Sequence, residues 1–149
     1  MKTTLTVEES ARLIELGVDP KMASMVSWKQ TETWARKSVL PNKEHLTLKP
    51  FKPMIIGFER FETKDVFTLA DILRILPKEI EDSNLDIIST QVDIKNHKKI
   101  SGWMVTYIDS HNDLAFGDES IFQAPELIDA LYSLLIWFLE NKIIKLKEE

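Results

Sequence analysis

The strongest hydrophobic pattern in the chain lies in its last third, where apolar residues recur every three or four positions. The residues that share this spacing are Leu127, Ile128, Leu131, Leu134, Leu135, Phe138 and Leu139. Such spacing forms a wide apolar stripe along one face of an α-helix. Pro125 suits the first turn, where a missing backbone donor costs nothing. The pattern predicts a core helix over residues 125–141.

A second pattern, with period two, predicts a β-hairpin. Apolar and polar residues alternate over residues 85–94 and again over residues 100–109, which places alternate side chains on one face of each strand. The residues that share a face are Ile88, Val92 and Ile94 in the first strand and Trp103, Val105 and Tyr107 in the second. The polar residues 95–99 join the strands, and a further strand is expected near residues 114–117.

Two short helices are predicted from their start signals. Thr6 and Glu9 have the spacing of a capping box, in which each side chain satisfies a backbone donor at a helix start. Thr68 is expected to cap a second helix that ends at Pro77. The residues expected on the buried side of this second helix are Leu69, Ile72, Leu73 and Leu76.

The segment between these helices predicts less regular structure. Residues 25–40 are rich in Thr, Val and Trp, which favours a hairpin anchored by Trp28 and Trp34. Residues 37–53 contain prolines that exclude a central strand, so an irregular surface loop is expected there. Residues 54–61 can form a strand. Together these elements predict an α+β fold: an antiparallel sheet of about four or five strands, packed on one face by the C-terminal helix, with two short helices at the edges.

Composition supports one globular domain over residues 1–149. With 44% hydrophobic and 29% charged residues, the chain is neither disordered nor fibrous, and its net charge of −5 disfavours an extended nucleic-acid surface. There is no cysteine, no apolar run of membrane-spanning length and no secretory pattern at the start of the sequence. We therefore expect a cytoplasmic protein that has no membrane partner and no cofactor.

Several segments resemble known proteins. Residues 68–77, the Trp103 hairpin and residues 127–141 are similar to small uncharacterised proteins encoded in prophages and mobile elements of gut Bacteroidetes, and residues 6–20 resemble their opening segment. The resemblance implies a phage-related or horizontally transferred protein. It implies no catalytic or binding residue, because these segments carry no chemical motif.

One turn gathers possible metal ligands. Asp109, His111 and Asp113, followed by Asp118 and Glu119, could hold a divalent cation for a small metal-dependent hydrolase or nuclease. The turn does not fit a calcium loop, which requires glycine at its sixth position and a glutamate at its twelfth. This chain has Leu114 and Ser120 at those positions. A solvated turn, with Asp109 bonded to the backbone, is the interpretation we favour.

The predicted hairpin tip is basic and gives a second alternative. Lys95, His97, Lys98 and Lys99 could contact phosphates, as basic β-ribbons do in some nucleic-acid-binding proteins. Lysines at hairpin ends also protect sheets against aggregation, and no second basic stripe supports the binding interpretation. Nucleic acid is therefore not the expected partner.

Trp137 is out of place on the final helix. It falls on the side opposite the apolar stripe, close to Ser133 and beside Ile136. Since aromatic residues are enriched at interface centres, this back face is a candidate contact for another protein or a second copy. The alternative is that the tail over residues 143–146 or the proline-containing loop covers Trp137 within the monomer. The sequence contains no P-loop, Rossmann fingerprint or nucleophile elbow, so we expect a non-enzymatic interaction module.

Overall fold

The computed structural model describes residues 1–32, 44–50, 60–94 and 98–144 and confirms an α+β fold. The helical elements are α1 (Val7–Glu15), η1 (Pro20–Met22), α2 (Leu69–Ile75), η3 (Asp118–Ser120) and α3 (Leu127–Glu140). The strands are β1 (Met25–Glu32), β2 (His45–Leu48), β3 (Arg60–Val66), β4 (Glu79–Ile80), β5 (Ser83–Ile94), β6 (Lys98–Ile108) and β7 (Phe122–Ala124). None of the helices in the described part is long and apolar enough to cross a membrane.

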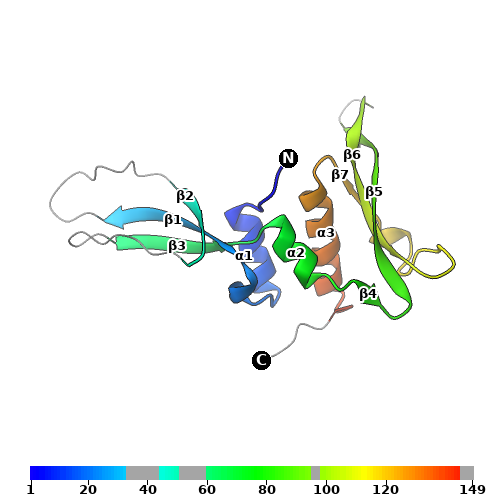
Figure 1. The fold of residues 1–149 in the computed structure, drawn as a ribbon, viewed down its shortest axis with the longest axis horizontal. Helices are drawn as coiled ribbons and strands as arrows, with labels where there is room; N and C mark the ends of the chain where they lie inside the picture. The colour runs from blue at the N-terminus through cyan, green and yellow to red at the C-terminus, as the bar shows by residue number, and fades with distance from the viewer. Residues whose placement is uncertain (33–43, 51–59, 95–97, 145–149) are drawn as a thin grey trace.

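The strands divide into two antiparallel sheets rather than the single sheet expected. One has three strands in the order β2-β1-β3, and the other has four in the order β4-β5-β6-β7. Figure 1 shows the three-stranded sheet projecting from the helices, and we call it the arm. The four-stranded sheet lies on the opposite side of the helices, with α3 between it and the shorter helices α1 and α2.

The predicted core helix is confirmed and is buried on more than one side. Its fully enclosed side chains are those of Ile128, Ala130, Leu131, Leu134, Leu135 and Phe138. This set is wider than one stripe because α3 packs on α2 as well as on β6 and β7. Pro125 lies outside the helix, and Glu126 occupies the N-cap position.

Both short helices begin as predicted, through complete capping boxes at Thr6 and Thr68. The buried side of α2 differs from the prediction. Leu73 is 38% exposed, whereas Ile75 is buried with Ile72 and Leu76. Ile72, Ile75 and Leu76 belong to the core cluster that also contains the buried side chains of α3.

Several expectations for the middle of the chain are wrong. Residues 45–48, expected in an irregular loop, form β2, because β1 offers a pairing edge for them. Residues 114–117 make only an isolated bridge between Ile108 and Leu114, and the strand beside β6 is β7. In place of the hairpin predicted over residues 25–40, β1 pairs with both β2 and β3. Trp34 and residues 54–59 lie outside the described residues.

The long β5–β6 hairpin is confirmed, and its two faces differ. Val105 and Tyr107 are enclosed and lie on the face toward α3, where the Tyr107 hydroxyl donates to the Pro77 carbonyl at 2.5 Å. Burial raises the pKa of Tyr107 far above its usual value. Ile88 pairs with Met104 on the opposite face, and Val92 packs there against Gly102. Gly102 is required because a side chain at this position would meet both Val92 and a backbone carbonyl.

A buried carboxylate ties the arm to the helices. Asp71, fully buried in the first turn of α2, accepts hydrogen bonds from the Ser24 amide at 2.8 Å, the Ser24 hydroxyl at 2.8 Å and the Thr68 amide at 2.9 Å. Its second oxygen pairs with Arg74. Since Ser24 directly precedes β1, one side chain fixes both the start of α2 and the root of the arm.

We expect Gly102→Ala to destabilise the fold by about 1–3 kcal/mol, as overpacking does. A Cβ at this position would lie 2.6 Å from Val92 Cγ2 and 2.7 Å from the Ala124 carbonyl oxygen, and the carbonyl cannot move away cheaply. Urea denaturation measures the change. Ser101→Ala, at the exposed neighbouring position, is the control; equal midpoints for the two variants would contradict the prediction.

We expect Asp71→Asn to lower the free energy of unfolding by about 1–3 kcal/mol. Asparagine lacks the negative charge that pairs with Arg74 and that strengthens the hydrogen bonds from the backbone donors. The same denaturation measurement applies, with the exposed Asp82→Asn as a control that should stay within about 0.5 kcal/mol of the wild type. An unchanged unfolding midpoint for Asp71→Asn would show that the carboxylate does not hold the junction.

Candidate functional site

An open groove of about 410 Å³ lies where the arm meets the start of α1. Leu5 and Val7 line it from the helix side, and Leu46 and Val66 line it from the arm. Thr6, Glu8, Ser27, Glu44 and His45 complete the lining. Its volume falls within the range of roughly 300–1,000 Å³ that is usual for ligand sites.

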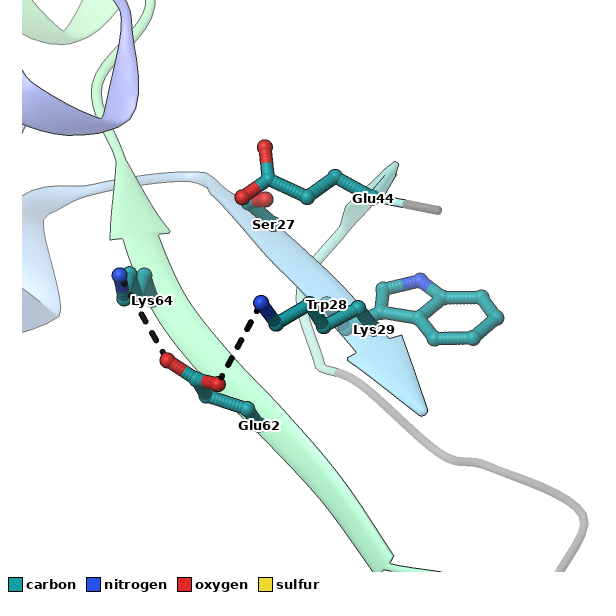
Figure 2. A pocket seen from close by; sticks show the side chains of 6 residues that line it. All are labelled: Ser27, Trp28, Lys29, Glu44, Glu62 and Lys64. Atoms are coloured by element: carbon teal, nitrogen blue, oxygen red, sulfur yellow. Dashed lines mark ion pairs between the residues drawn. The ribbon is translucent and has the colours of Figure 1, made fainter. Parts of the chain in front are cut away.

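A charged pocket continues from the groove along the same face of the arm, sharing Ser27 and Glu44 with it. Figure 2 shows Lys29 and Lys64 on either side of Glu62. The Glu62 carboxylate lies 3.8 Å from the Lys29 ammonium and 3.5 Å from that of Lys64. These pairs are exposed, so each contributes little to stability. The charged pocket nevertheless makes one end of the groove polar, whereas the other end is apolar.

The pairing register decides which side chains reach the groove. Ser27 lies directly between Leu46 on β2 and Lys64 on β3, and side chains opposite one another share a face. The neighbouring Trp28 therefore belongs to the other face, where its ring stacks on His45 at 4.3 Å and meets Phe61 edge-on at 5.7 Å. This aromatic cluster joins the three strands of the arm and supports the groove from behind.

The groove adjoins an edge strand. Among the described residues, β2 pairs with β1 alone, so one side of its backbone is available for pairing within that part of the chain. Leu46 and Leu48, on the groove face of β2, are 44% and 69% exposed. Exposed leucines on an edge strand favour contact with another polypeptide.

The groove is lined by both apolar and charged side chains. In the described part of the chain, His, Asp and Glu side chains nowhere gather in threes close enough to hold a metal ion. The groove combines an apolar floor with carboxylates on its rim, which can recognise an apolar side chain flanked by a basic one. The sequence pattern places Thr6 at a helix start, but it assigns none of the groove residues to a site. The prolines around residues 45–48 concealed the alternating pattern that could have revealed β2.

The proposed metal turn proves to be held by its own backbone. Asp109 Oδ1 accepts from the amide of His111 at 2.8 Å and from that of Asp113 at 3.0 Å. These hydrogen bonds lower the pKa of Asp109 below its usual value. The side chains of His111 and Asp113 are exposed and are not brought together with Asp109 as a ligand group.

The proposed nucleic-acid contact is only partly described. Lys98 and Lys99 are exposed at the start of β6, where Lys99 lies across from Asp93 on β5. Lys95 and His97 lie outside the described residues. Of the two described lysines, Lys99 thus lies opposite a carboxylate, whereas Lys98 is paired with Ile94.

The back face of α3 already has neighbours within the chain. Ser133, Ile136 and Trp137 are each half-buried. The Trp137 ring lies 6.3 Å from that of Phe116, in the loop after β6, and the Ser133 hydroxyl donates to the Asp129 carbonyl. Whether this face also meets another protein stays a prediction.

Comparisons with protein-family models, curated proteins and solved structures find no match for this chain.

We expect the Asp109 carboxyl to titrate below 3.8, its ordinary value, when followed by NMR, because two backbone amides stabilise its charged form. A depressed pKa in the folded state means that the contribution to stability is present at neutral pH and is lost as the pH falls through that pKa. A midpoint at or above the ordinary value would contradict the described turn.

Proposed function

We propose that the protein is a non-enzymatic interaction module that binds an extended segment of a partner protein along β2, with one apolar side chain in the groove. The observation that carries this proposal is the position of Leu46, which is exposed on an edge strand and also lines the groove. A partner strand that pairs with β2 gains backbone hydrogen bonds, and alternate side chains provide specificity.

Charge defines the partner further. The carboxylates of Glu8 and Glu44 stand at exposed positions on the rim of the groove. The two lysines of the adjoining pocket already lie beside Glu62. The fitting segment therefore has an apolar residue in the groove and a lysine or arginine near it, facing the rim carboxylates.

The resemblance to proteins of mobile elements is consistent with such a role and suggests the biological context in which the protein acts. We propose that the protein is phage-related and acts in the cytoplasm. This setting rests on the segments over residues 68–77 and 127–141 and carries no information about the partner.

A displayed library of short random peptides tests the proposal. Peptides selected on the wild type are expected to share an apolar residue with a nearby lysine or arginine. Leu46→Glu should weaken their binding by about tenfold or more, because it places a charge at the mouth of an apolar groove. Glu44→Lys should weaken it as well, by reversing a rim charge.

Leu73→Glu is the matched control, since Leu73 is an exposed leucine of similar accessibility on α2, away from the groove. It should bind the selected peptides as the wild type does. Equal binding by the wild type and Leu46→Glu, with unchanged circular dichroism, would overturn the proposed site.

A further inference from the structure

The outer edge of β5 is a second pairing surface, separate from the groove. β5 has 12 residues, yet β4 pairs with only Ser83 and Asn84 at its start. Beyond these, the described residues supply no further partner strand for that edge. In Figure 1, the β5–β6 hairpin forms the side of the molecule opposite the arm.

The hydrogen-bonding direction along this edge follows from one contact. The Leu85 amide donates to the Lys78 carbonyl at 3.3 Å, away from β6. In an antiparallel ladder, the backbone groups of successive residues point alternately to the two sides. The amides and carbonyls that also point outward are therefore those of Ile87, Ser89, Gln91 and Asp93.

We propose that two copies of the chain pair antiparallel through β5, about a two-fold axis at Thr90, so that their four-stranded sheets join into one continuous sheet. In this register Ser89 lies opposite the partner's Gln91, and Ile87 lies opposite the partner's Asp93. Every outward-pointing group in this stretch then meets a complementary one. Four residue pairs, each exchanging two bonds, give about eight hydrogen bonds.

The side chains are symmetric about the same residue. Ile88, Thr90 and Val92 share the sheet face away from α3, so each Ile88 lies opposite the partner's Val92, and the two threonines face each other on the axis. Paired β-branched residues and paired threonines both stabilise neighbouring strands. Ile88 is 40% exposed, so pairing would cover apolar surface that the isolated chain leaves open.

Charge permits this register. Asp93 lies opposite the partner's Ile87 rather than another carboxylate, and Lys99 stands across from Asp93 on β6. The β4 strand covers only the first two positions of β5, outside the stretch from 87 to 93. An isologous contact of this kind closes after two copies, because the outer edge of β5 is then paired in both of them.

Sedimentation equilibrium of the whole chain tests the proposal. The wild type is expected to be a dimer at micromolar concentrations. Ile88→Lys should weaken association by about tenfold or more, because it places an ammonium group against the partner's Val92. Leu73→Lys, at an exposed leucine on α2, is the matched control and should leave the dimer intact.

A variant without a new charge separates pairing from electrostatic repulsion. Gln91→Pro removes one outward amide at an edge position that tolerates proline, and it should also dissociate the dimer while the circular dichroism stays unchanged. Hydrogen exchange gives an independent readout. Amides of Ile87, Ser89, Gln91 and Asp93 should gain protection as the protein concentration rises, whereas those of Ile88 and Val92, which face β6, should be protected at every concentration.

A wild type that stays monomeric at high concentration would overturn the proposal. So would a dimer that survives Ile88→Lys and Gln91→Pro but dissociates with Trp137→Arg, since that result would place the interface on α3. Peptide binding at the β2 groove is measured separately, so failure of one proposal leaves the other standing.

Discussion

The structure depends on a single helix that is buried from several directions. The 14 residues of α3 pack on α2 at one side and on β6 and β7 at the other. Among the described helices α3 is the longest, and its buried side chains belong to the same core cluster as those of α2 and β6. Its enclosed leucines and Phe138 are therefore shared by the two layers, and truncating one of them would weaken both.

Because the core is built around α3, strands at the edges of both sheets lack a partner strand on one side, among the described residues. The four-stranded sheet packs one face on α3, and in the described part of the chain the arm contacts the helices near its root. The large apolar residues exposed on the described strands are Leu46 and Leu48 on β2, Ile87 and Ile88 on β5, and Ile100 on β6. Both proposed contacts are made by edge strands, which already carry the backbone groups needed to add another strand.

The sequence predicts the parts of this fold whose signals are local. The stripe of α3, the capping box at Thr6, the helix cap at Thr68 and the β5–β6 alternation can each be recognised within a short window. Residues 45–48 could not be recognised as a strand, because four residues among prolines become a strand only when β1 lies beside them. The division into two sheets, and with it the groove, depends on which strands pair over long distances, and no local pattern encodes that choice.

The hydrogen bonds of Asp71 impose an order on the formation of the arm. Ser24 is 47 residues earlier in the chain than the carboxylate that holds it. During synthesis β1 leaves the ribosome well before α2. Ser24 is therefore made before the carboxylate that accepts its hydrogen bonds. The arm can therefore be fixed in place only after the chain has grown past Asp71, which makes its docking a late, long-range step of folding.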